Sequence, residues 1–158
     1  MNIIPIKSTG IAAVLLKEIN NIYHVLLLKR TSHNLNNIWC YIGGSIEDGE
    51  TAIGAVYREI AEETGITELV LYSSNQFDQI FSPQENYIYI APVFVGFVHE
   101  EQSVVLNDEH SEYQWIPFEK AKEVVSLPGN EEVLQSIENN FVKKKPLTYL
   151  KIKLLQDI

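Results

Sequence analysis

One glutamate-rich stretch, from Gly43 to Ile66, constrains this chain more than any other part, and it reads GGSIEDGETAIGAVYREIAEETGI. A pair of glycines opens it, which favours a tight turn. Thr51 is a good N-cap residue, and Gly65 suits the left-handed position just past a helix end. We therefore expect a helix over Ala52–Thr64.

Three carboxylates share one face of the expected helix, because Glu59, Glu62 and Glu63 stand at i, i+3 and i+4. Carboxylates this close raise each other's pKa unless a cation lies among them. The pattern is compatible with a solvated surface, since glutamate is a good helix former. It also suits Mg²⁺ or Mn²⁺, which prefer oxygen ligands and share them with substrate phosphates. An adjoining apolar face would pack on a core, and it consists of Ala52, Val56 and Ile60.

The residues around these glutamates resemble the signature of the Nudix hydrolases. That signature is a glycine, five free positions, a glutamate, seven free positions, and then Arg-Glu-aliphatic-x-Glu-Glu-x-Gly-aliphatic. Family members often have a proline before the paired glycines, where this chain has Ile42, and this departure removes no ligand. The positions that match are Gly44, Glu50, Arg58, Glu59, Ile60, Glu62, Glu63, Gly65 and Ile66.

The resemblance implies a role for each residue of the motif. It implies a metal site for Mg²⁺, with Mn²⁺ as a substitute, formed by the Gly43 carbonyl and by Glu59, Glu62 and Glu63. Glu50 and Arg58 would brace the loop on the helix, and Arg58 would hydrogen-bond a glutamate and so orient it. Gly44 would let substrate approach the backbone without a Cβ in the way, while Gly65 has a structural role.

Several residues outside the motif are further candidates. Glu109 resembles a loop carboxylate that some Nudix enzymes use as a metal ligand or general base, although it also suits an exposed position in the acidic loop 100–110. The proton acceptor is Glu59 or Glu109, and the expected catalytic residues are Arg58, Glu59, Glu62 and Glu109. Arg30 would face a substrate phosphate, His110 is expected at the surface, and an aromatic ring could stack on a base or pack in the core at Trp39, Phe81 and Tyr87.

Composition limits the classes of partner. The formal net charge is −9 with no long basic segment, which argues against binding nucleic acid or an anionic membrane through bulk charge. Cys40 is the only cysteine, so no intramolecular disulfide and no cysteine-based zinc site can form. No signal segment or membrane-length apolar run is present, so we expect a cytoplasmic protein. A chain of 158 residues fits a single domain over 1–158.

The remaining pattern predicts an α/β protein, a mixed β-sheet sandwiched between α-helices, as the Nudix resemblance also implies. A hairpin over residues 8–17 and 23–30 would turn at 18–21. We expect further strands over 39–42, 69–81 with a bend at 73–75, 87–98 and 113–116. Pro92 inside the strand over 87–98 implies an edge position or a bulge. Helices are expected at 118–125 and 130–142, and the tail from Lys143 would add a strand or a dimer contact, in a monomer or homodimer.

Substrate choice rests on a finer resemblance. The segments EHSEYQWI and WCYIGGSIEDGET are similar to those of enzymes that cleave dihydroneopterin triphosphate and dATP. This implies a Mg²⁺-dependent pyrophosphohydrolase that converts a nucleoside triphosphate-like compound to monophosphate and pyrophosphate. An ADP-ribose or other nucleoside diphosphate-X pyrophosphatase is the alternative, because Pro83 lies near where those enzymes carry a proline. A non-catalytic regulatory domain that binds nucleotides is the alternative of another class.

Overall fold

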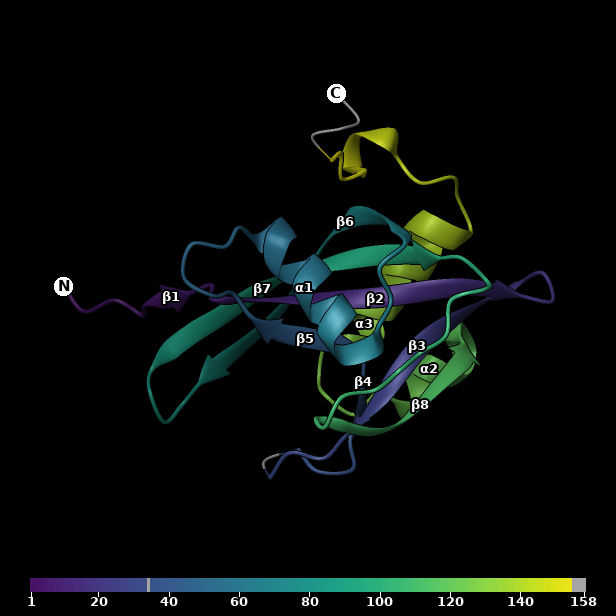
Figure 1. Cartoon of the computed structure of the whole chain (residues 1–158). Coiled ribbons are helices and arrows are strands. Elements are labelled where there is room, and N and C mark those ends of the chain that lie inside the picture. Colours follow the sequence, from purple (N-terminus) through teal and green to yellow (C-terminus); the bar gives the residue numbers. More distant parts are fainter. Residues whose placement is uncertain (34, 155–158) are drawn as a thin grey trace.

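The computed structural model describes residues 1–33 and 35–154. Within these ranges eight strands form one mixed sheet, in which β7 pairs in parallel with both β1 and β2 and the other pairings are antiparallel (Figure 1). The path runs β1-β7-β2-β3-β4, while β5 pairs with β2, β6 with β7 and β8 with β3. The strands are β1 (Ile6–Lys7), β2 (Gly10–Ile19), β3 (Ile22–Arg30), β4 (Trp39–Cys40), β5 (Ile42–Ser45), β6 (Leu69–Ser82), β7 (Tyr87–Val98) and β8 (His110–Pro117).

Helices cover both faces of this sheet, so the expected α/β/α sandwich is present. β2 is buried on both faces, and its side chains alternate between two cores. Ile11, Ala13 and Leu15 join the core under α1 (Ala52–Thr64). On the opposite face Ala12, Val14 and Leu16 join the core under α2 (Phe118–Val124) and α3 (Asn130–Ile137). Figure 1 shows α1 in front of β2 and α3 behind it.

Local signals define α1 at both ends, as the sequence predicted. The Thr51 hydroxyl accepts a hydrogen bond from the Gly54 amide at 3.0 Å. Gly65 takes the left-handed conformation at φ 74° and donates its amide to the Ala61 carbonyl at 2.9 Å. Val56 and Ile60 are fully buried, so the apolar stripe of the helix lies on the sheet.

The first hairpin turns more tightly than expected. Asn20 and Asn21 both have positive φ, at 52° and 67°, and they alone separate β2 from β3. Asparagine tolerates this conformation, which matches the twist of a two-residue hairpin. Both strands therefore extend beyond the ranges that the apolar runs predicted.

The glycine pair lies in a strand, and the expected turn at this position is wrong. Gly43 and Gly44 belong to β5, where they pair with Ala12 and Ile11 of β2. The left-handed glycine of the following loop is Gly49, at φ 83°. The expected strand over 39–42 is divided at Tyr41, between β4 and β5.

β7 is not an edge strand, because it has neighbours on both sides, but Pro92 itself has no ladder partner on the side away from β6. It pairs with Phe77 of β6, and on the other side it falls between the segment paired with β1 and the segment that begins at Val93 and pairs with β2. A proline without an amide hydrogen fits such a break in the ladder. The expected bend in β6 is confirmed, since the register shifts between Ser73 and Gln76.

The C-terminal third follows the predicted pattern with three differences. β8 begins at His110 rather than at residue 113, because its first residue pairs with Arg30 beyond a register shift between β8 and β3. α3 ends at Ile137 and continues as a π-helical turn, η1 (Glu138–Val142). The tail forms the short 3₁₀ turn η2 (Thr148–Leu150) and a single bridge to Tyr72 in place of a full added strand. Residues 155–158 of the tail lie outside the described ranges. No helix in the described part of the chain combines the length and the apolar character needed to cross a membrane.

Candidate active site

A pocket of about 500 Å³ opens where α1, β5, the end of β3 and the start of β8 meet. Six of the expected site residues line it: Arg30, Gly43, Gly44, Glu59, Glu63 and Glu109. Strand pairing explains why residues this far apart in the sequence converge. β5 and β3 both pair with β2, and β8 pairs with β3.

Arg58 joins the loop before α1 to the helix, as expected. Its Nε and Nη2 atoms donate to both carboxylate oxygens of Glu50, at 2.7 and 2.8 Å, and Nη2 also donates to the Ser45 carbonyl at 2.9 Å. Its Nη1 atom donates to Glu59 at 2.9 Å. The Arg58 hydrogen bonds hold the pKa of Glu50 at about 2, helped by the amide of Glu47. The guanidinium therefore fixes a carboxylate on each side of it.

Glu59 lies directly over the backbone of Gly44. A Cβ at residue 44 would stand 2.2 Å from the Glu59 carboxyl carbon, so only glycine leaves room for that side chain. Burial raises the pKa of Glu59, although the contact with Arg58 opposes the shift. The carboxylate is thus held in one place and is partly removed from water.

Glu63 is the most deeply buried carboxylate of the site, with 3% of its surface exposed. Its Oε2 atom has no hydrogen-bond partner. Burial raises its pKa to about 8, and the charges of Glu59 and Glu109 add to the shift. An unsatisfied buried carboxylate oxygen among other carboxylates fits a divalent cation, whose positive charge would balance the carboxylates.

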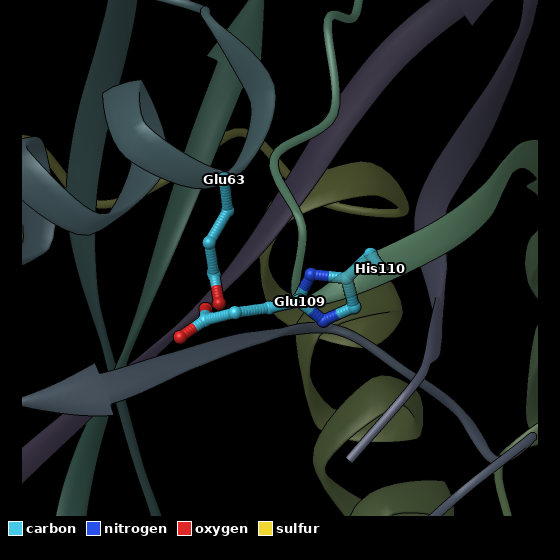
Figure 2. Close-up of side chains that lie close together, drawn as sticks. All are labelled: Glu63, Glu109 and His110. Carbon is cyan, nitrogen blue, oxygen red and sulfur yellow. The ribbon is translucent and has the colours of Figure 1, made fainter.

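Glu109 and His110 approach Glu63 from the other side of the pocket (Figure 2). One potential ligand atom from each of the three residues lies within 4.8 Å of the others. Thr31, just past β3, fixes the loop that carries Glu109, since its amide donates to the Glu109 carbonyl and its hydroxyl to the Asp108 carbonyl, both at 3.0 Å.

His110 is buried, so its expected surface position is wrong. Only 7% of it is exposed, and its Nδ1 atom has no partner. Burial lowers the pKa of the imidazole, and the positive charge of Arg30 lowers it further. No local signal marks this residue, because its position in the strand depends on the register shift between Lys29 and Arg30.

Arg58, Glu50 and Gly65 lie outside the pocket lining, and so do three further expected site residues. The Glu62 carboxylate accepts a hydrogen bond from Arg58 at 3.2 Å, and its side chain is 54% exposed. Trp39 packs against the core under α3, which is the core alternative of the sequence analysis. Phe81 lies near the end of β6 and is about half exposed.

A second pocket, of about 290 Å³, adjoins the first and shares Arg30, Gly43 and Gly44 with it. The Tyr41 hydroxyl donates to Asp78 at 2.5 Å and accepts from the Asn130 amide at 2.7 Å. Burial raises the pKa of Asp78 despite the Tyr41 hydrogen bond. No site role for Tyr41, Asp78 or Asn130 was predicted from the sequence. An acidic residue within the expected strand 69–81 was an available signal, at Asp78.

Comparison with known proteins shows which family the chain belongs to. A model of the NUDIX domain matches residues 8–137, which is most of the chain. The chain belongs to the Nudix family. A curated relative, the RNA pyrophosphohydrolase of Mannheimia succiniciproducens, is 30% identical over 99 residues. The match covers 52% of this Nudix chain and 50% of the relative, so the chain spans about half the length of the curated relative that it matches.

Solved structures share the fold. The Escherichia coli dihydroneopterin triphosphate pyrophosphohydrolase matches at a TM-score of 0.67 and 26% identity, over 89% of this chain and 97% of that protein. The MutT protein of Methanosarcina mazei matches at a TM-score of 0.67 and 28% identity, over 85% of this chain and 94% of that protein. The Caenorhabditis elegans Ap4A hydrolase, in a binary complex, matches at a TM-score of 0.71 and 19% identity, over 82% of this chain and 94% of that protein. The last likeness, at low identity, shows the fold alone.

Proposed function

We propose that this Nudix protein is a Mg²⁺-dependent pyrophosphohydrolase that cleaves a nucleoside triphosphate-like compound, of the dATP or dihydroneopterin triphosphate type, to monophosphate and pyrophosphate. The observation that carries the proposal is the buried, unsatisfied carboxylate of Glu63 in a pocket that also contains Glu59, Glu109 and Arg30. Of the structural relatives described above, the two that exceed 25% identity include a pyrophosphohydrolase of that substrate type.

The acidic side of the pocket would hold the cation. Glu59, Glu63, Glu109 and the Gly43 carbonyl are the proposed ligands, and Mn²⁺ would substitute for Mg²⁺. When bound, the cation supplies positive charge to the phosphate oxygens and lowers the pKa of a water molecule. Glu62, which the resemblance implies as a metal ligand, lies outside the pocket lining, so we propose that it serves instead as an outer carboxylate bonded to Arg58.

The other residues bind substrate and accept a proton. Arg30 is the cationic side chain of this pocket's lining, so it would bind a phosphate oxygen of the substrate. The proton acceptor is Glu59 or Glu109. Arg58 holds Glu59 in place, whereas Glu109 is exposed at the pocket rim, where a water molecule can reach it. Comparing Glu59→Gln with Glu109→Gln at saturating Mg²⁺ separates the two assignments, since loss of the acceptor lowers kcat even when metal is bound.

The second pocket would receive the base. It continues directly from the phosphate pocket past Gly44, and it presents the Asp78 carboxylate and the Asn130 amide beside the Tyr41 ring. A purine or pterin ring carries both donors and acceptors along its edge, so it matches this mixed lining. Flat rings also stack favourably on aromatic side chains such as those of Tyr41 and Tyr89.

The deciding experiment measures kcat/KM for dATP, dihydroneopterin triphosphate and ADP-ribose side by side, with product analysis. Specificity is the ratio of these constants. We expect a triphosphate to be preferred and pyrophosphate to be released. Preference for ADP-ribose would overturn the substrate and leave the metal chemistry in place. Nucleotide binding with no product from any substrate would instead indicate a regulatory domain.

A further inference from the structure

Two buried polar side chains from distant parts of the chain meet in the site without satisfying each other. Glu63 comes from the last turn of α1 and His110 from the first residue of β8, and both are more than nine-tenths buried. The Glu63 Oε2 atom and the His110 Nδ1 atom each have no hydrogen-bond partner. Buried polar atoms are rarely left in this state, so a pair of them in one pocket indicates that an absent group lies between them.

The donor set at this position contains nitrogen as well as oxygen. Potential ligand atoms of Glu63, Glu109 and His110 lie within 4.8 Å of one another, and Figure 2 shows the imidazole beside the two carboxyl groups. Carboxylates suit Mg²⁺ and Mn²⁺ alike, whereas imidazole suits transition ions and contributes little to Mg²⁺ binding. A site with one nitrogen and two carboxylates therefore discriminates among divalent ions.

We propose that His110 is a nitrogen ligand to a divalent cation that Glu63 and Glu109 also bind, and that this ligand makes the site prefer Mn²⁺ and Co²⁺ to Mg²⁺. The inference rests on the proposed function in one respect, that the pocket holds a divalent ion. It adds a ligand to the carboxylate set and an order of affinities. His110 can fill this role because the Thr31 contacts hold the preceding loop against β3 and keep the imidazole in the pocket.

The direct test uses Mn²⁺ alone with the unaltered protein. Pulsed electron paramagnetic resonance of one Mn²⁺ per chain should show hyperfine coupling to an imidazole nitrogen. The coupling should disappear in His110→Gln and persist in His99→Gln, whose histidine is exposed and lies outside the pocket. Absence of nitrogen coupling in the unaltered protein overturns the inference, and this result does not depend on whether the variant folds.

Calorimetric titrations test the selectivity. His110→Gln, shown to be folded by circular dichroism, should bind Co²⁺ about tenfold more weakly, while Mg²⁺ affinity changes less than about twofold. An equal loss of affinity for Co²⁺ and Mg²⁺ would mean that His110 has only a structural role. Hydrolysis of dATP is measured separately. Hydrolysis without nitrogen coupling rejects this inference alone, and nitrogen coupling without hydrolysis of any nucleotide rejects the proposed function alone.

Discussion

At the scale of single residues, the absence of one side-chain atom shapes the site. Gly43 and Gly44 are neighbours in β5, yet a Cβ on each meets very different surroundings. At Gly44 it would stand 2.2 Å from the Glu59 carboxyl carbon, while at Gly43 the nearest atom, the Ile11 carbonyl oxygen, is 3.7 Å away. The two glycines therefore form a matched pair for testing the position of Glu59.

Gly44→Ala should lower kcat by at least about tenfold, roughly 1.4 kcal/mol in the barrier, because the new methyl group displaces the Glu59 carboxylate. Gly43→Ala should keep kcat within about threefold, since its methyl group makes an ordinary contact and leaves the carbonyl in place. Steady-state kinetics with dATP compare the two variants. Equal losses in both would show that the close approach of Glu59 to Gly44 does not matter for turnover.

Glu63 predicts a pH-dependent effect of the metal on stability. Its pKa is about 8 in the folded, cation-free protein against 4.5 for a free carboxyl group. The folded state therefore holds the extra proton between these values, and its stability falls as pH rises through that window. A divalent cation replaces the proton, so Mg²⁺ should raise Tm more at about pH 8 than at about pH 5. Glu63→Gln should remove this difference, and a Tm increase independent of pH would contradict the assignment.

At the scale of elements, the sequence predicts what depends on neighbours along the chain. α1 was predicted residue for residue because its signals, at Thr51 and Gly65, are local caps. β5 was missed because its two glycines read as a turn, and only pairing with β2 makes them a strand. The position of His110 depends on a register shift between β8 and β3, which no local pattern contains. The carboxylates of the site were thus predictable, whereas its imidazole and the second pocket were not.

Arg58 links the loop between β5 and α1 to the helix, and this link should matter even when metal is saturating. Arg58→Ala removes hydrogen bonds to Glu50, Glu59 and the Ser45 carbonyl, so we expect kcat to fall by about tenfold or more. Glu47→Ala is the control, because its carboxylate is 3.6 Å from Arg58 and is mostly exposed. If higher Mg²⁺ concentration restores full activity to Arg58→Ala, the residue tunes only metal affinity.

α2 is joined to the end of α3 by the nearly buried amine of Lys122. Its Nζ atom donates to Glu138 and Gln135 at 2.7 Å each and to Glu119 at 3.0 Å. Lys122→Ala leaves the Glu138 carboxylate, whose side chain is 13% exposed, without its nearest cation, and should lower the free energy of unfolding by about 1–3 kcal/mol. Lys120→Ala removes only an exposed pair at 3.7 Å and should cost less than about 0.5 kcal/mol. Urea unfolding measures the loss of unfolding free energy in both variants. Similar losses would show that burial of the Lys122–Glu138 pair is unimportant.

At the scale of the whole molecule, net charge bears on the size of the substrate. The curated relative acts on RNA by its name, yet this chain carries a formal charge of −9. A polyanion longer than a nucleotide would meet this charge beyond the pocket, while a mononucleotide would need only the proposed cation and Arg30.

We therefore expect kcat/KM for dATP to exceed that for a 5′-triphosphorylated RNA by at least about tenfold at low salt, where charge repulsion is least screened. Raising the salt concentration at constant free Mg²⁺ should lower the ratio of kcat/KM for dATP to kcat/KM for the RNA. The same RNA with a 5′-monophosphate serves as the control for inhibition by RNA binding. An RNA substrate preferred at low salt would reverse the argument from net charge.

The parallel pairing of β2 with β7 has a consequence for how the chain reaches its native state. Ala12 pairs with Val93, so the middle of the sheet cannot close until more than half of the polypeptide has left the ribosome. Contacts between such distant partners slow folding, because a long loop must close before they form. Until then the core under α1 contains residues of β2, β3 and β5 but lacks those of β6 and β7, such as Leu71 and Phe94. Glu63 likewise lacks Glu109 and His110 beside it. A growing chain would therefore complete the proposed metal site only late, after the strand that carries His110 has been made.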